Sequence, residues 1–119
     1  MDVKSVIDAR KFSAEKLAKI ALYESERLAC DVYGVEPGQE QKPHTHPACD
    51  KIYYVVEGCG TFRVGGEVRE VGEKNVVYVP AGIEHSVKND SPAKLTLLVF
   101  VSPHPAYAAR SETRPSPRA

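Results

Sequence analysis

Three of the four histidines lie in two segments whose composition favours β-strands. His44 and His46 are two residues apart, so on an extended strand both imidazoles project from the same face. His85 follows the turn sequence Pro80-Ala81-Gly82, which fixes where the next strand begins. Neutral imidazole is the commonest side-chain ligand for transition metals such as iron and zinc. Three converging imidazoles leave coordination positions open for water or substrate, which suits a reactive metal site better than a structural one.

Length and composition indicate a soluble protein of one domain. At 119 residues, the chain is expected to bury a single core within residues 1–105. Its 16 basic and 16 acidic residues are interspersed, so no cluster of positive charge favours nucleic acid. No apolar run approaches the ~18 residues of a membrane span, and the N-terminal residues lack the apolar core of a signal peptide. We therefore expect a cytoplasmic protein with no nucleic-acid or membrane partner.

The cysteines and the remaining histidine are expected to have structural roles. The three cysteines match no zinc-binding spacing, and in a reducing cytoplasm they are most simply thiols. Cys49 lies three residues after His46 and could reach the site, although a packing role in the connection between two strands fits it better. His104 lies between two prolines and is expected to be an ordinary surface residue.

Short β-prone runs separated by turn residues dominate the chain. Gly65-Gly66 is a two-residue hairpin signal, and short strands at such spacing predict an antiparallel sandwich or barrel. The only helix candidate covers residues 13–21, where Ser13 is a suitable N-cap, but it is too short to stand alone and residues 20–23 could equally begin a strand. The expected strands cover residues 19–23, 28–35, 52–56, 61–64, 67–71, 76–79, 86–88 and 94–101.

We expect three segments along the chain. Residues 1–35 form an N-terminal extension whose strands serve packing and dimerisation, and residues 36–102 form the barrel core. Residues 106–119 are rich in proline and arginine and are expected to form a disordered tail. Strand edges left open by the extension are commonly paired with another subunit, so a homodimer is predicted.

Two motifs make the chain resemble the small single-domain cupins, whose fold is a jelly-roll β-barrel. The first motif is a glycine, five residues and His-x-His, with a later glutamate and glycine, and the second is Pro-x-Gly-x-x-His followed by an asparagine. The resemblance implies an all-β fold and a metal held by the motif histidines. The matching positions are Gly38, His44, His46 and Gly58 in the first motif, and Pro80, Gly82, His85 and Asn89 in the second.

The chain departs from this family pattern at two lysines. Lys51 stands where the family usually has its metal-binding glutamate, and Lys74 stands at the leading glycine of the second motif. The change at Lys74 is expected only to reshape a turn. The change at Lys51 alters the chemistry, because an ammonium group donates protons and repels a divalent cation.

Three outcomes are open at position 51. Lys51 turns away and leaves a three-histidine site completed by water, Asp50 supplies a fourth ligand, or Lys51 points into the barrel and binds an anionic substrate group. Side-chain alternation allows either Lys51 or Asp50 to face inward, because residues 52–56 are all apolar or tyrosine. The family register favours Lys51 inward or at the rim, with three histidine ligands.

Two functions of different class follow. The first is a metalloenzyme in which the histidines hold iron, nickel, manganese or zinc, and resemblance to small cupin dioxygenases implies chemistry on a small polar or anionic molecule. In this hypothesis Lys51 orients the substrate. Tyr53, Tyr54 and Tyr78 are expected to pack, and Tyr53 and Tyr78 are the candidates to direct a hydroxyl into the cavity. The second is a non-catalytic module that binds a small molecule or a metal for sensing. No residue is an obvious general base, so the substrate does not follow from the sequence.

Overall fold

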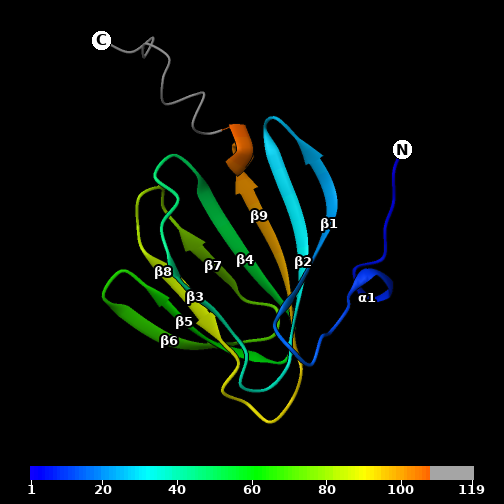
Figure 1. The fold of residues 1–119 in the computed structure, drawn as a ribbon, viewed down its shortest axis with the longest axis vertical. Helices are drawn as coiled ribbons and strands as arrows, with labels where there is room; N and C mark the ends of the chain where they lie inside the picture. The colour runs from blue at the N-terminus through cyan, green and yellow to red at the C-terminus, as the bar shows by residue number, and fades with distance from the viewer. Residues whose placement is uncertain (108–119) are drawn as a thin grey trace.

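The protein is a jelly-roll barrel of two facing antiparallel β-sheets (Figure 1). The computed structural model describes residues 1–107. The larger sheet has the order β1-β2-β9-β4-β7, and the smaller has the order β3-β8-β5-β6. The elements are α1 (Val6–Ala9), β1 (Ala18–Ser25), β2 (Leu28–Val35), β3 (Glu40–His44), β4 (Asp50–Glu57), β5 (Cys59–Val64), β6 (Glu67–Gly72), β7 (Val76–Val79), β8 (His85–Lys88) and β9 (Leu95–Ser102).

Alternating side chains of the larger sheet build one wall of the barrel interior. In β4, Tyr53 and Val55 are fully buried, and the smaller sheet contributes Phe62 and Val87 from the other side. Burying one such apolar side chain stabilises the fold by about 1.5–3 kcal/mol before conformational entropy is counted. The interior-facing residues of β4 are the odd-numbered ones, so the register fixes which of its polar side chains reach the interior.

The two histidine-bearing segments are joined at one end of the barrel. Gly82 adopts a φ of +83°, a conformation that suits glycine, and its backbone N–H donates to the carbonyl of His46 at 2.9 Å. This hydrogen bond ties the turn before β8 to the segment after β3. Because β3 and β8 also pair directly, with His44 opposite His85, the sheet itself places those two imidazoles side by side.

Most predicted strands are confirmed, and the predicted helix is wrong. The runs at 28–35 and 76–79 match β2 and β7, and the Gly65-Gly66 turn joins β5 to β6 with Val64 opposite Glu67. Residues 13–21 contain no helix, because β1 begins at Ala18 and pairs with β2 along its length. Tertiary pairing overrides the local helix preference there. The predicted tail falls largely on residues 108–119, outside the described part of the chain.

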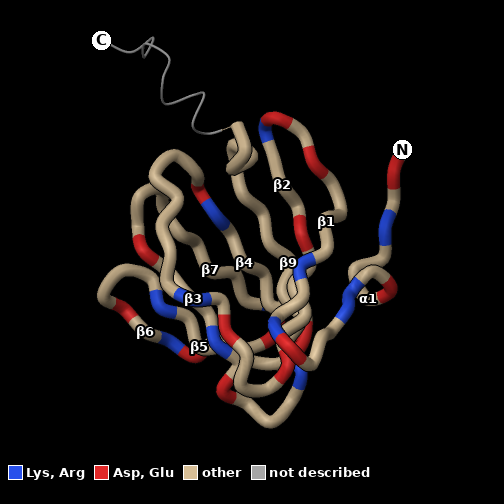
Figure 2. The backbone as a smooth tube through the Cα atoms, in the orientation of Figure 1, with Lys and Arg blue, Asp and Glu red and all other residues tan. Residues whose placement is uncertain are grey.

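A short helix occurs instead near the N-terminus. α1 begins after Ser5, whose hydroxyl accepts a hydrogen bond from the Asp8 N–H at 3.1 Å. The signal was a serine followed three residues later by an acid, which is an N-cap pattern. No helix among residues 1–107 is long and apolar enough to cross a membrane. Figure 2 shows Lys and Arg interspersed with Asp and Glu along the backbone, as the balanced composition predicts.

The turn before β7 holds its lysine in a left-handed backbone conformation. Lys74 has a φ of +66° and is exposed. It therefore adopts a left-handed conformation although it carries a β-carbon. Its N–H donates to the carbonyl of Val55 at 2.8 Å, which holds the turn against β4.

Candidate metal centre

His44, His46 and His85 form one compact cluster. Each offers a ring nitrogen, and the three nitrogens lie within 4.8 Å of one another. Ring centroids are 4.1 Å apart for His44 and His85, 5.0 Å for His44 and His46, and 5.9 Å for His46 and His85. Nitrogens bound tetrahedrally at about 2.1 Å to zinc would be about 3.4 Å apart, so small side-chain rotations complete the geometry. The structure brings together all three predicted ligands.

Backbone carbonyls fix which nitrogen faces the cluster. Nδ1 of His44 donates to the carbonyl of Lys42 at 2.9 Å, and Nδ1 of His85 donates to the carbonyl of Ile83 at 3.0 Å. Each ring therefore carries its proton on Nδ1 and leaves Nε2 with a lone pair. Such backbone contacts are the usual second partners of metal-bound histidines.

The buried nitrogen of His85 is the atom that most clearly lacks a partner. His85 is only 1% exposed, and its Nε2 has no hydrogen-bond partner among the described residues. Buried polar atoms are nearly always satisfied, and an unsatisfied one is unfavourable by about 1–3 kcal/mol. A metal ion at the cluster would satisfy this nitrogen. The donor set fits a divalent transition metal.

The electrostatics of the site keep the imidazoles neutral. The pKa of His85 is lowered to about 4, mainly by burial and also by the nearby Lys51, although the hydrogen bond to the Ile83 carbonyl raises it. Burial is also the main cause that lowers the pKa values of His44 and His46. Imidazole must be deprotonated to bind a metal, so all three ligands are in the binding form at neutral pH.

Lys51 points into the barrel beside the histidines. It is 1% exposed, and its Nζ lies 3.4 Å from Nε2 of His44 and donates to Oε1 of Gln41 at 3.3 Å. Gln41 also accepts a 2.6 Å hydrogen bond from the Tyr53 hydroxyl and donates to the Tyr33 hydroxyl at 3.3 Å. Burial lowers the pKa of Lys51 to about 7. The inward register expected from the family pattern is the one observed.

Asp50, proposed as a fourth ligand, lies outside the cluster. Because Lys51 faces the interior, Asp50 faces outward, where its Oδ1 accepts a hydrogen bond from the Ala81 N–H at 3.0 Å. This carboxylate anchors the turn that precedes His85. Asp50 therefore acts on the site only indirectly, by holding the backbone of the turn that positions His85.

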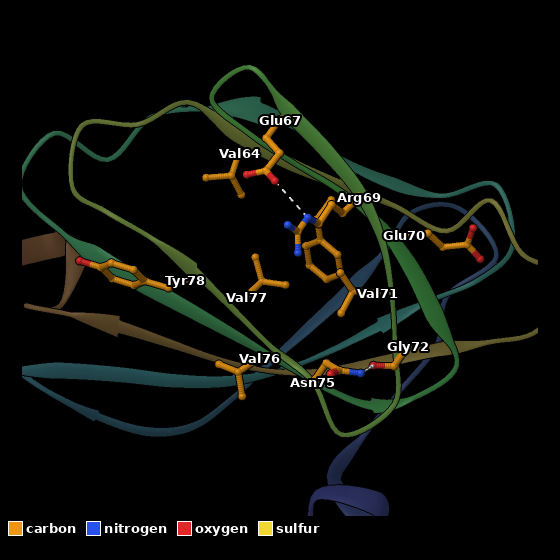
Figure 3. Close-up of a pocket in the computed structure, with 11 residues that line it drawn as sticks. Val64, Glu67, Arg69, Glu70, Val71, Gly72, Asn75, Val76, Val77 and Tyr78 are labelled. Carbon is orange, nitrogen blue, oxygen red and sulfur yellow. Dashed lines mark hydrogen bonds and ion pairs between the residues drawn. The ribbon is translucent and has the colours of Figure 1, made fainter.

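Tyr78, predicted to direct a hydroxyl into the site, is not brought there. In the pairing of β4 with β7, Tyr78 lies opposite Ile52 and is 55% exposed, whereas Val77 lies opposite the buried Tyr53. Tyr78 lines a separate hollow beside β6 and β7, at whose edge Figure 3 shows it. The reason is that successive side chains of β7 point to opposite faces of the sheet, so Val77 faces inward and Tyr78 faces outward. Tyr53 does face the interior, but its hydroxyl is engaged by Gln41.

A cavity of about 440 Å³ opens beside the histidines, and most of its polar lining was missed from the sequence. Gln41, Tyr33 and Asp31 face it from β3 and β2. For Asp31 and Tyr33 the signal was the two-residue alternation of β2, since Ala29 and Val35 are core residues on the same face. Cys49 is a buried core residue outside the histidine cluster.

Comparison with known proteins agrees with the fold. Residues 31–101 match the cupin domain family, and the chain belongs to this family. An uncharacterized protein of Streptomyces coelicolor is 33% identical over 99 residues, covering 78% of this chain and 91% of that protein. The crystal structure of TT1209 from Thermus thermophilus is similar, with a TM-score of 0.85, 39% identity, and coverage of 87% of this chain and 98% of that chain.

One further relative matches over a smaller part of both proteins. The tetracenomycin polyketide synthase protein TcmJ of Streptomyces glaucescens is 30% identical over 67 residues, which cover 56% of this chain and 45% of that protein. The chain therefore spans less than half of that relative.

Proposed function

We propose that this cupin binds one divalent transition metal ion through His44, His46 and His85, and that its cavity presents a small anionic molecule to that ion. The observation that carries the proposal is the buried, unpartnered Nε2 of His85 within a cluster whose other rings are oriented by backbone carbonyls. Iron, nickel, manganese and zinc all accept imidazole ligands. The site carries no carboxylate ligand, so a bound ion keeps its full positive charge.

The chain's own residues would bind and orient the substrate. The bound ion would supply Lewis acidity, or dioxygen chemistry in the dioxygenase-like form of the proposal. Lys51 is buried next to His44, where its ammonium attracts an anionic group of the substrate. Tyr53 positions Lys51 through the Gln41 amide oxygen, to which both donate. Tyr53 thus supports the substrate-binding lysine.

Elemental analysis of the purified protein tests the metal site. We expect about one equivalent of a transition metal in the wild type and a loss of at least ~90% in His44→Ala. His104→Ala is the matched control, because His104 lines the same cavity but is paired with Glu24 at 3.1 Å. Metal content that His44→Ala leaves unchanged, or that both variants lower equally, would refute the proposal.

A non-catalytic binding module is the alternative function. The observation that favours it is Lys51 itself, whose ammonium lies 3.4 Å from His44 Nε2 and satisfies that nitrogen without a metal. Oxygen uptake or turnover of a small acid by the iron-loaded protein would favour the enzyme. Stoichiometric ligand binding without turnover would favour the module.

We also propose that the protein is a cytoplasmic homodimer joined at the edge of the larger sheet. β1 is the outer strand there and, within residues 1–107, pairs with β2 alone, so one of its edges is open to a second copy. Light scattering at micromolar concentration should give twice the chain mass of 13.1 kDa. A monomeric mass would contradict this assembly.

A further inference from the structure

The wall of the cavity formed by β1 and β2 carries two charged residues. Asp31 lies between Ala29 and Tyr33 on the core face of β2, and it is opposite the buried Val99 of β9. Lys19 on β1 is opposite Tyr33, so it shares the same face of the sheet. Both line the cavity that the histidines border, with Asp31 half-buried and Lys19 at the exposed rim.

Neither residue is neutralised by a partner. Among the described residues, Lys19, Asp31 and Lys51 form no ion pair within 4.0 Å, whereas the other acid in the lining, Glu24, is paired with His104. The ammonium of Lys19 lies 5.1 Å from the ring centroid of Tyr33, and that of Lys51 lies 5.8 Å from it. Two cations and one carboxylate thus surround the same cavity without a direct partner of opposite charge.

This arrangement requires a particular kind of ligand. The buried ammonium of Lys51 is unfavourable without a counter-charge, and Lys19 adds a second cation at the rim, so the two favour an anion between them. The Asp31 carboxylate can only accept hydrogen bonds when ionised, so it favours a donor on the ligand. A ligand ammonium would be repelled by Lys19 and Lys51, whereas a hydroxyl would not. The complementary molecule therefore combines an anionic group, such as a carboxylate, with a hydroxyl.

We propose that the cavity selects a small hydroxy acid, with the ligand carboxylate held by Lys19 and Lys51 and a ligand hydroxyl donating to Asp31. This inference rests on the proposed function, since it specifies the small anionic molecule that the metal site receives. The pKa of Asp31 is raised by burial and then by Glu24, against the attraction of Lys19, which agrees with a carboxylate that lacks a close partner. Asp31 is a residue that determines which acid binds.

Matched pairs of acids test the proposal by isothermal titration calorimetry on zinc-loaded protein. The probes are glycolate and acetate, 3-hydroxybutyrate and butyrate, and gluconate and hexanoate. In the wild type, we expect at least one hydroxy acid to bind about tenfold or more tightly than its partner, as for a hydrogen bond to a charged group. Asp31→Asn should reduce that preference to about twofold or less, mainly by weakening the hydroxy acid.

Three further variants make the test specific. Glu24→Gln removes the other carboxylate of the lining and should leave the preference unchanged. Lys19→Gln should weaken both acids of a pair by a similar factor, about threefold to tenfold, and so also leave the preference unchanged. Circular dichroism establishes whether each variant folds. If Asp31→Asn does not fold, Asp31→Ser is used in its place.

The outcomes separate this inference from the metal proposal. A wild type with no preference in any pair, or a folded Asp31 variant that keeps the preference, would overturn the hydroxy-acid assignment even if zinc is bound stoichiometrically. The titrations are repeated after chelator treatment. A preference that depends on Asp31 in protein without zinc affinity would support the hydroxy-acid assignment while refuting the metal site.

Discussion

Two regions of the molecule carry a lysine where the cupin pattern has another residue, and one of these lysines is buried whereas the other is exposed. Lys51 lies in the barrel interior, 1% exposed, with its Nζ against Gln41 and His44. Lys74 lies in the exposed turn before β7, where it keeps a φ of +66°. At position 51 the side chain determines the chemistry, whereas at position 74 only the backbone conformation is needed.

The difference indicates which departures from a family pattern change function. The side chain at position 74 is exposed and forms no hydrogen bond or ion pair among residues 1–107, so lysine is tolerated with some local strain. The side chain at position 51 reaches a predicted metal ligand and a buried hydrogen-bond network, so its charge acts on the whole site. The following predictions test this contrast, from the largest expected effect to the smallest.

Replacing Lys51 with the family's acidic residue should strengthen metal binding. Lys51→Glu removes a cation beside His44 and adds a carboxylate, so zinc affinity measured by competition with a chelator should rise at least about tenfold. Lys74→Glu makes the same change of net charge in the exposed turn and should have almost no effect. Equal gains from the two variants would show that position 51 has no special place at the site.

Replacing Lys51 with an apolar residue should stabilise the metal-free protein. Lys51→Met removes a buried ammonium and should raise the free energy of unfolding at pH 7 by about 1–4 kcal/mol. Lys74→Met should change it little. Urea denaturation with a chelator present measures both, and a loss of stability in Lys51→Met would contradict the account.

The gain from Lys51→Met should depend on pH with a defined sign. The pKa of Lys51 is lowered from 10.5 to about 7, so between these values the unfolded wild type holds a proton that the folded state has lost. Wild-type stability attributable to this group therefore rises with pH across that window. The advantage of Lys51→Met should be full below pH 7 and shrink toward pH 10.5, and a constant advantage would argue against a buried charge as its cause.

The hydrogen-bond network that holds Lys51 should contribute a smaller amount. Tyr53→Phe removes the 2.6 Å hydrogen bond to Gln41 and should lower the free energy of unfolding by about 1 kcal/mol. Tyr54→Phe is the control, because the neighbouring Tyr54 faces the other side of β4. Urea denaturation compares the two, and equal losses would mean that the interior hydroxyl has no particular role.

The smallest effect is expected at the turn. Lys74→Gly removes the strain of a left-handed conformation, whereas the flexibility of glycine in the unfolded state offsets part of that gain. The net rise in the free energy of unfolding should be about 0.5 kcal/mol. Lys74→Ala retains a β-carbon and should give no gain. Thermal unfolding of the three proteins side by side measures the difference, and a gain in both variants would remove strain as the explanation.

Much of the fold and the ligand set could be predicted from the sequence. The spacing of His44, His46 and His85 indicated the cluster because each lies at a fixed position relative to a turn or a paired strand. The orientation of Lys51 could not be settled by alternation alone, because both faces of β4 carry apolar residues. The helix over residues 13–21 was mispredicted because pairing between β1 and β2 decides the conformation of its second half, where the β-prone residues 19–23 were the only local signal.

The polar lining of the cavity was the least predictable part. Asp31 looks like an ordinary charged residue in a strand until the register of β2 against β9 turns it toward the interior. Gln41 likewise gains its role only when β3 brings it next to Lys51 and Tyr53. Such contacts join residues that are distant in the sequence, so single-sequence patterns do not contain them.

The most direct test of the central claim is nitrogen NMR of the histidine rings during titration with zinc. The account predicts that at one equivalent the Nε2 resonances of His44 and His85 shift together with one ring nitrogen of His46, while Nδ1 of His44 and His85 stays protonated against its backbone carbonyl. His104 should remain unchanged. Ring signals of the three cluster histidines that do not respond to one equivalent, or a response at His104 alone, would contradict a metal centre at this site.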